Sequence, residues 1–182
     1  MKSGKTPEEW EKKPAKNRQK DKDARWTKKH GRSHFGYKNH VCVDRRHKLV
    51  RRYAVSSASV HDSQKFEDLL DPDNTASTVW ADSAYRSKEN EEKLAARGFT
   101  SRIHRRGCRN KPLTARQEAA NKTRSSVRAR VEHVFGSQHT SMGGKLVRTI
   151  GIARATMKIG MQNLAYNMRR LVVLERIAVA TG

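Results

Sequence analysis

The excess of basic side chains is the feature that most limits what this chain can fold into. Lysine and arginine total 40 against 18 aspartates and glutamates, so the formal net charge is +22 over 182 residues. Such a charge opposes compaction by self-repulsion unless a polyanion supplies the counter-charge. With 35% hydrophobic residues, the composition is polar for a globular protein without being that of a fully disordered chain. We therefore expect one partly folded domain whose partner is nucleic acid.

The charge is distributed unevenly along the chain. Residues 1–32 contain 12 basic and 5 acidic side chains and no apolar periodicity, which predicts a basic extended arm. Residues 62–92 reverse the sign, with 9 acidic and 3 basic side chains. Residues 101–158 hold 14 basic side chains and only Glu118 and Glu132 as acids. A lone glutamate among arginines is either a functional group or a surface ion-pair partner of little energetic weight.

Hydrophobic periodicity and turn residues predict a mixed α/β domain over residues 33–142. Two runs of alternating residues flank a polar turn and predict an antiparallel hairpin. Further along, amphipathic patterns with capping residues predict helices, and short apolar runs predict strands. The expected order is strand, strand, helix, strand, helix, strand, long helix. These elements are expected at 33–43, 49–55, 62–70, 78–81, 88–97, 99–106 and from 114 past 135.

Two apolar stripes at helical spacing are predicted to face the core. The first lies on the long helix, from Val127 to Phe135. The second lies in a C-terminal helical segment, residues 145–178, which is expected to pack on the domain through it. Gly143 and Gly144 are expected to form the joint between the two helices. The second stripe alternates spacings of four and three and consists of Met157, Met161, Leu164, Met168, Leu171 and Leu174.

Membrane and secreted classes are disfavoured by the sequence. No stretch approaches the roughly 18 consecutive apolar residues of a membrane span, and no apolar segment typical of a signal peptide follows Met1. Two cysteines, Cys42 and Cys108, cannot form a disulfide framework. We expect a cytoplasmic protein without a membrane partner.

Two carboxylates stand where chemistry could take place. Asp82 follows the most apolar short strand, and ligands of α/β domains gather at the carboxyl ends of strands. Glu132 is expected on the long helix, on one face with Arg124 and Arg128 and with His139 seven residues beyond. Carboxylates that converge from a strand end and a helix can hold Mg²⁺ or Mn²⁺ ions, which activate a water or 3′-hydroxyl in phosphodiester transfer. The surrounding arginines would hold a DNA backbone.

Six short motifs occur in order over nearly the whole chain. They are Asp23–Lys29 (DARWTKK), Phe35–His40 (FGYKNH), His61–Ser63 (HDS), Ala81–Tyr85 (ADSAY), Arg128–Gly136 (RARVEHVFG) and Asn163–Asn167 (NLAYN). This set resembles insertion-sequence transposases of the DDE type, in the IS-five-like group. The resemblance implies a ribonuclease-H-like catalytic domain, two divalent metal ions, and cut-and-paste transfer of a DNA element recognised by its terminal inverted repeats. It also implies a prokaryotic, nucleoid-associated protein.

The resemblance assigns roles to three residues. Asp82 resembles the second aspartate of the family, in its D-x-A-Y setting, and Glu132 resembles the final glutamate. Arg128 resembles the arginine four residues before that glutamate. Metal binding is therefore expected at Asp82 and Glu132. The expected DNA-binding residues are Arg124, Arg128, Arg130, Lys38 and His139.

The first aspartate of the family has no counterpart here. Neither Asp21, Asp23 nor Asp44 lies where it belongs, because that aspartate stands on the first strand, before the region that this chain resembles. The resemblance thus implies the C-terminal part of a catalytic domain: a mixed sheet with flanking helices that lacks its first strand, followed by C-terminal helices. Its metal site would hold two carboxylates instead of three.

Three functions fit these observations to different degrees. The first is a transposase fragment that is inactive alone and active only with a missing piece supplied in trans or as part of a longer frame-shifted product. Its expected partners are DNA and either further copies of the chain, as a homo-oligomer, or the missing N-terminal part of the transposase. The second is a non-catalytic basic DNA-binding remnant that occupies DNA or modulates the full-length transposase. The third, a generic basic RNA-binding protein, accounts for the charge but not for the ordered motifs.

Overall fold

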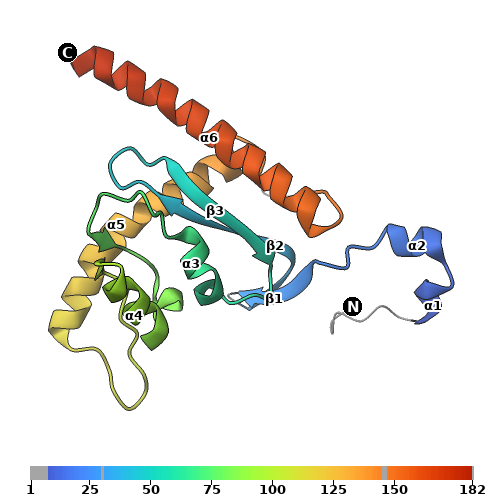
Figure 1. The fold of residues 1–182 in the computed structure, drawn as a ribbon, viewed down its shortest axis with the longest axis horizontal. Helices are drawn as coiled ribbons and strands as arrows, with labels where there is room; N and C mark the ends of the chain where they lie inside the picture. The colour runs from blue at the N-terminus through green and yellow to red at the C-terminus, as the bar shows by residue number, and fades with distance from the viewer. Residues whose placement is uncertain (1–7, 30, 145–146, 182) are drawn as a thin grey trace.

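A computed structural model describes residues 8–29, 31–144 and 147–181. Within them, strands and helices combine into a mixed α/β fold with one three-stranded sheet, one two-stranded sheet and two long helices (Figure 1). The helices are α1 (Glu8–Glu11), α2 (Pro14–Arg18), α3 (Phe66–Leu69), α4 (Lys88–Ala96), α5 (Ala115–Thr140) and α6 (Ile152–Thr181). The 3₁₀ turns are η1 (Asp62–Lys65) and η2 (Ser83–Tyr85). The strands are β1 (Arg25–Lys29), β2 (Arg32–Val43), β3 (Val50–Ser57), β4 (Thr78–Val79) and β5 (Thr100–Ser101).

The predicted hairpin is confirmed and extended by one strand. β2 pairs antiparallel with β3 from Tyr37↔Ser57 to Val43↔Val50, with a register shift at the last pair. The first half of β2 also pairs antiparallel with β1. The segment predicted as an extended basic arm therefore differs from that expectation, because it contains the short helices α1 and α2 and gives β1 to the sheet.

The second sheet consists of two short parallel strands. β4 and β5 pair at Thr78↔Thr100 and Val79↔Ser101. The predicted strand at 99–106 has only two residues in regular pairing, yet backbone hydrogen bonds continue beyond them. The amide of His104 donates to the carbonyl of Ala81 over 3.0 Å, so the chain stays extended up to the residue before Asp82. The predicted helix at 62–70 begins as η1 and continues as α3, and α4 lies where a helix was expected.

Two separate apolar clusters stabilise the fold. One joins α3, α4 and the segment after β5 through Phe66, Leu70, Leu94 and Ile103. The other joins β3, α5 and α6 through Val50, Val134 and Tyr166. Between them lies a cavity of about 1310 Å³, lined by β2 on one side and by β4 and the start of η2 on the other. The second half of β2 has a backbone edge without a pairing strand among the described residues, and β4 pairs only with β5 there.

Helix α5 begins at the predicted residue and is only partly buried. The Thr114 hydroxyl accepts from the Gln117 amide, and the Gln117 side chain accepts from the Thr114 amide, which forms a capping box. Val134 in its apolar stripe is fully buried, but Phe135, also predicted to face the core, is 38% exposed.

The prediction that the C-terminal stripe packs on the domain is wrong. α6 does pack on the sheet, against β3, but the stripe points away from it. Leu174 is half-buried, whereas the other five residues lie in solvent. Their exposed fractions are 67% for Met157, 64% for Met161, 60% for Leu164, 61% for Met168 and 47% for Leu171.

The buried face of α6 is small and combines apolar with amide side chains, which explains why periodicity did not identify it. Asn163 accepts hydrogen bonds from Gln138 of α5 over 2.8 Å and from Asn39 of β2 over 3.0 Å. Asn167 pairs with both backbone groups of Val50, at 2.8 Å each. These bonds satisfy buried polar groups and help the apolar cluster around Tyr166 to fix α6 on the sheet. The buried residues of α6 are Ala155, Ile159, Asn163 and Tyr166. Among the described residues, none of the helices is long and apolar enough to cross a membrane.

Candidate active site

Asp82 lies three residues after the end of β4 and directly precedes η2, of which it is the N-cap. Its backbone is extended, and its Oδ1 accepts a hydrogen bond of 2.6 Å from the amide of Ser83, the first residue of η2. A side-chain oxygen that caps a helical turn satisfies one of the free amides of that turn. This local structure directs the carboxylate toward α5, at the end of the strand where the sequence predicts a functional group.

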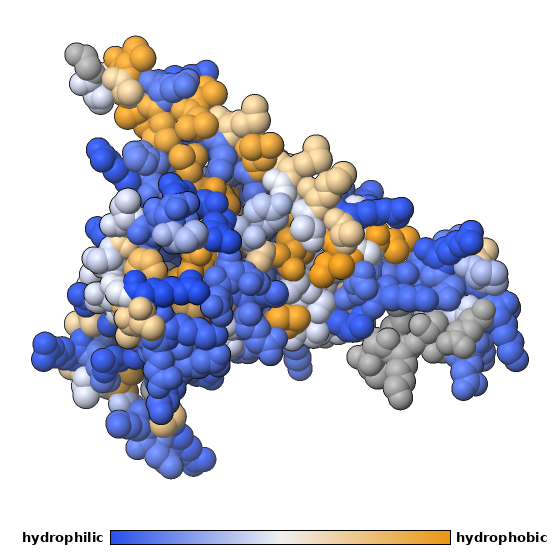
Figure 2. All heavy atoms as spheres, viewed as in Figure 1, coloured by the Kyte–Doolittle hydropathy of each residue, from blue (hydrophilic) through white to orange (hydrophobic). Residues whose placement is uncertain are grey.

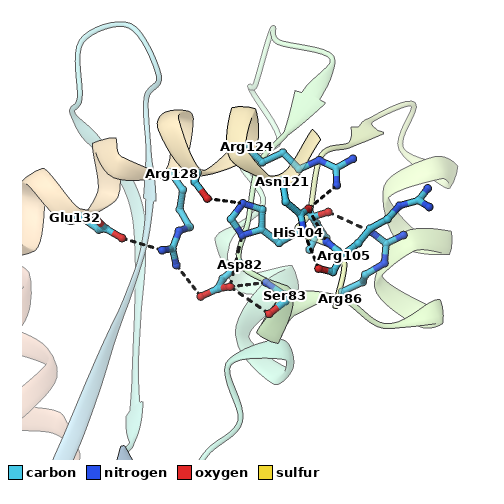
Figure 3. A network of polar contacts seen from close by, with 11 residues as sticks. Asp82, Ser83, Arg86, His104, Arg105, Asn121, Arg124, Arg128 and Glu132 are labelled. Atoms are coloured by element: carbon cyan, nitrogen blue, oxygen red, sulfur yellow. Dashed lines mark hydrogen bonds and ion pairs between the residues drawn. The ribbon is translucent and has the colours of Figure 1, made fainter. Parts of the chain in front are cut away.

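Arg128 bridges the two predicted carboxylates. Its Nη1 lies 2.8 Å from Asp82 Oδ2, and its Nη2 lies 2.9 Å from Glu132 Oε1 (Figure 3). Glu132 stands four residues after Arg128 on α5, so both project from the same helix face. The side chains of Arg128, Asp82 and Glu132 are 35%, 44% and 64% exposed. The structure thus brings together the two carboxylates and the arginine that the sequence singles out.

His104 is a neighbour of Asp82 that sequence reasoning missed. Its Nδ1 lies 3.8 Å from Asp82 Oδ1, and its Nε2 lies 3.4 Å from the Ser125 hydroxyl of α5. The imidazole therefore links the aspartate to the helix that carries Glu132. A usable signal existed, since His104 follows β5, the strand paired with the one that ends at Asp82.

Several arginines lie next to the network formed by Asp82, Arg128, Glu132 and His104. Arg124 donates to Asn121 over 3.0 Å, and Asn121 in turn bonds both backbone groups of Arg105 (Figure 3). The pKa of Arg124 lies below its ordinary value because its guanidinium is partly buried and faces the positive charges of Arg105, Arg86 and Arg102. We call these four residues, Arg86, Arg102, Arg105 and Arg124, the arginine cluster. It is an electropositive site beside two carboxylates.

The other predicted DNA-binding residues lie outside the network. Lys38 of β2 donates to the carbonyl of Val60 and pairs with Asp62 at 3.0 Å. Arg130 donates to the carbonyl of Arg45 over 2.8 Å. His139 is exposed in the last turn of α5, seven residues after Glu132. Lys38 does line the same cavity as Asp82, so it faces the same interior space without contacting the pair.

The carboxylates of Asp82 and Glu132 suit a hard divalent cation, but two carboxylates are too few to complete a metal site. Asp82 and Glu132 already converge on one positive charge, the Arg128 guanidinium, and carboxylate oxygens are the ligands that Mg²⁺ and Mn²⁺ prefer. In the part of the chain that the structure describes, however, no group of three or more ligating side chains could hold a metal ion. These residues therefore fit as two ligands of a site with a further donor.

Comparison with known proteins identifies the family to which this sequence is similar. Residues 9–168 match the family described as "Transposase DDE domain". A protein of Neisseria meningitidis serogroup B, named "Transposase for insertion sequence element IS1106", is 32% identical over 149 residues, which is 82% of this chain and 51% of that protein. The chain thus spans about half the length of this curated relative. No solved structure matches the chain.

Proposed function

This chain belongs to the family of transposases with a DDE domain, and we propose that Asp82 and Glu132 are catalytic carboxylates for cleaving and joining DNA strands. The substrate would be an insertion element, recognised at its terminal inverted repeats, and its target. The observation that carries this proposal is the convergence of the two carboxylates on Arg128, although they come from a strand end and from a helix far apart in sequence. A bound Mg²⁺ or Mn²⁺ ion would activate the attacking water or 3′-hydroxyl and stabilise the leaving oxygen.

Each residue of the network has a distinct role in this proposal. Asp82 is the fixed ligand, because the Ser83 amide already holds one of its oxygens. Glu132 is the adaptable ligand, since its side chain is the most exposed of the three. Arg128 is a positioning residue, which holds the carboxylates together when they carry no metal and prevents their mutual repulsion. The His104 imidazole, whose Nδ1 lies 3.8 Å from Asp82 Oδ1, lies beside the carboxylate and limits its rotation.

The arginine cluster supplies a place for the DNA backbone in this proposal. Burial and the repulsion of the neighbouring arginines lower the pKa of Arg124, and an incoming phosphate would relieve that repulsion. Arg105 of the cluster directly follows His104, whose Nδ1 lies 3.8 Å from Asp82 Oδ1, so a phosphate bound there would lie near the carboxylates. Arg124 is thus the best supported of the predicted DNA-binding residues. Lys38, Arg130 and His139 stay predictions, with roles along the flanking DNA.

The proposal includes a ribonuclease-H-like sheet, and the cavity between the two apolar clusters supports it. A further strand between β2 and β4 would join the two sheets into one, in the order β3, β2, added strand, β4, β5. The cavity is bordered by Val41 and Val43 of the second cluster and by Val79 and Ala81 of the first, so such a strand would merge the two clusters into one core. A carboxylate on it would supply the missing metal ligand.

A second candidate function is favoured by the absence of a third ligating side chain within the described residues. In that case the chain binds DNA and modulates a complete transposase without catalysing strand cleavage. The arginine cluster serves both functions equally, so DNA binding alone does not separate them. Metal-dependent nicking does.

A nicking assay with end-labelled terminal-repeat DNA and Mn²⁺ tests the proposal. The variants Asp82→Asn and Glu132→Gln remove one negative charge each with little change of shape. Glu118→Gln, on the same helix and outside the network, is the matched control. We expect the wild-type chain and Glu118→Gln to nick alike and both site variants to lose the activity, with unchanged DNA affinity.

The outcomes of the nicking assay distinguish the two candidate functions. If the wild-type chain nicks no better than both site variants while all four bind DNA equally, the catalytic role of this chain is refuted and the modulator function stands. A synthetic strand-forming peptide with a carboxylate that increases nicking by the wild type and by Glu118→Gln, but not by the site variants, would support the added strand.

A further inference from the structure

A pair of aromatic side chains lies exposed on a part of the sheet that the proposed active site does not use. Trp26 of β1 and Phe35 of β2 are direct cross-strand partners, with ring centroids 5.3 Å apart. Their exposed fractions are 48% and 44%. Away from α6, the visible face of the molecule is mostly hydrophilic (Figure 2). Two adjacent exposed rings on one face of a strand pair therefore offer a stacking surface to a ligand.

The aromatic pair belongs to a two-stranded ribbon that extends beyond β3. Residues 25–29 of β1 pair with residues 32–36 of β2, whereas β3 pairs with β2 only from Tyr37 onward. Figure 1 shows β1 at the end of the β2–β3 hairpin that is remote from its turn. Gly36 has a φ of 143°, which glycine adopts most readily, where β2 changes its partner from β1 to β3. We call residues 25–29 and 32–36 the aromatic ribbon.

The aromatic ribbon is also strongly basic. Four of its ten residues are lysine or arginine, and none is acidic. Lys28, Lys29 and Arg32 are exposed and form no ion pair with any residue that the structure describes. Alternation along the strands places Lys28 on the same face as Trp26 and Phe35. The ribbon therefore combines aromatic rings with positive charges that are available to a polyanion.

This combination fits an unpaired base of DNA. Proteins that bind single-stranded nucleic acid use cations to contact the phosphates and aromatic side chains on which the bases stack. A fully paired duplex offers the same phosphates, but its bases are stacked on one another and their faces are covered. The cations of the ribbon therefore serve DNA of either form, whereas the aromatic pair adds affinity only where a base is unpaired.

The base of the aromatic ribbon is fixed to the rest of the protein. The Tyr37 hydroxyl, directly after the β2 half of the ribbon, donates to the Asp21 carboxylate over 2.7 Å. Asp23, two residues before β1, accepts from the amide of Ile152 at the start of α6 over 2.8 Å. These bonds reduce the conformational freedom that the ribbon would lose on binding, which favours affinity.

The aromatic ribbon borders the cavity of the proposed active site. Lys28 and Phe35 line the same cavity as Asp82. The added strand of the proposed function would pair with the second half of β2, so it leaves the ribbon, formed by the first half, accessible. A base held on the ribbon would keep one DNA strand from pairing near the proposed catalytic carboxylates.

We propose that the aromatic ribbon is a binding site for an unpaired base of DNA. The base stacks on the exposed rings of Trp26 and Phe35, and phosphates of the same strand contact Lys28 and the neighbouring cations. The inference rests on the DNA partner of the proposed function, which both candidate functions share, and not on catalysis. The ribbon is distinct from the arginine cluster, which would bind phosphate without a base.

Binding of two labelled DNA duplexes, followed by fluorescence anisotropy, tests this proposal. One duplex is fully paired, and the other is identical except for a short bulge of unpaired thymines. The wild type should bind the bulged duplex about tenfold more tightly, since stacking of a base on an aromatic ring contributes at least this much. Trp26→Leu and Phe35→Leu keep an apolar cross-strand contact and should lose most of this preference, with unchanged affinity for the paired duplex.

Two further variants separate charge from stacking. Lys28→Gln should weaken the binding of both duplexes and make the slope of log affinity against log salt shallower by about 0.7–0.9. Trp26→Leu and Phe35→Leu should leave that slope unchanged. Phe135→Leu is the matched control, because it replaces an exposed aromatic residue of α5 outside the ribbon, and it should keep the preference for the bulge.

Trp26 fluorescence gives a second measurement that leaves the aromatic pair intact. The chain has three tryptophans, so Trp10→Phe and Trp80→Phe together make Trp26 the only emitter. Stacking of a base should quench its emission when the bulged duplex binds and not when the paired duplex binds. Equal quenching by the two duplexes, or none, overturns the proposal whatever the leucine variants do.

The affinities themselves can also overturn the proposal. A wild type that binds both duplexes equally does so, as does a preference that both leucine variants retain. In either case the DNA partner of the proposed function stands, because the paired duplex is still bound. A chain that binds neither duplex refutes that partner, and the unpaired-base site with it.

Discussion

Replacing Arg128 by alanine tests whether this arginine and a divalent metal ion compete for the same two carboxylates. In the metal-free protein Arg128 makes two ion pairs, at 2.8 Å to Asp82 and 2.9 Å to Glu132. When a metal ion binds both carboxylates, those pairs must break. The substitution should therefore destabilise the protein without metal and leave it as stable as the wild type with metal.

The expected magnitude follows from the exposure of the partners. Ion pairs this exposed contribute about 0.2–1 kcal/mol each, and the pair within one helix belongs at the lower end. The Arg128 Nε is buried without a partner among the described residues, which offsets part of the gain. We therefore expect Arg128→Ala to lower the free energy of unfolding by about 1 kcal/mol, or the melting temperature by about 2–4 °C.

The metal dependence is the sharper part of the prediction. By linkage, a stability difference of about 1 kcal/mol that vanishes on saturation means that Arg128→Ala binds Mn²⁺ about fivefold more tightly than the wild type. Urea unfolding across a Mn²⁺ titration measures both quantities. Arg124→Ala is the control, because Arg124 bonds Asn121 and neither carboxylate, so its effect on stability should be the same at all Mn²⁺ concentrations.

Two results would refute this reasoning. One is an Arg128→Ala penalty that is equal without metal and at saturation, since the arginine and the ion would then not share ligands. The other is a Mn²⁺ affinity that Asp82→Asn and Glu132→Gln leave unchanged, because the ion would then bind elsewhere.

Three further predictions concern the core, pH and DNA. Leu94→Ala empties a fully buried position and should lower the free energy of unfolding by about 2–5 kcal/mol in urea titrations, with an effect under 1 kcal/mol marking a loosely packed site. Burial lowers the pKa of His40 below 6.5, so the unfolded chain binds the proton more readily. Stability should be constant above about pH 6.5 and fall as the pH drops through the folded-state pKa; a His40→Gln variant with the same decline would exclude this source. Arg124→Ala should make the slope of log DNA affinity against log salt shallower by about 0.9, whereas an unchanged slope would assign Arg124 to internal contacts.

Helices and strands that are determined by residues close together in the sequence could be predicted from it. The hairpin follows from alternation around a polar turn, and α5 begins at Thr114 because threonine and Gln117 form a capping box. The pairing of β1 with β2 could not be predicted in the same way. Its residues are mostly charged or polar, so no apolar alternation reveals that the backbone is paired.

The orientation of α6 could not be predicted, for a different physical reason. Periodicity reports which residues avoid water, not which surface covers them. On α6 the face toward the sheet is fixed by amides, Asn163 and Asn167, whose partners lie more than a hundred residues earlier in sequence. The apolar face of α6 is exposed. Sequence patterning identified the stripe correctly and wrongly predicted that it packs on the domain.

The site combines a predictable part with one that depends on tertiary structure. Asp82 and Glu132 have positional signals, a strand end and a helix face, and the structure places them together. Arg128 was expected to contact DNA, and its two terminal nitrogens are instead engaged by carboxylates. Electrostatics accounts for both roles of Arg128, as a partner of the carboxylates and as a DNA contact. Two neighbouring carboxylates repel each other unless a positive charge lies between them, so they retain Arg128 until a metal ion replaces it. Arg128 would then be released next to the arginine cluster, where a phosphate is its natural partner, so metal binding and DNA binding should reinforce each other.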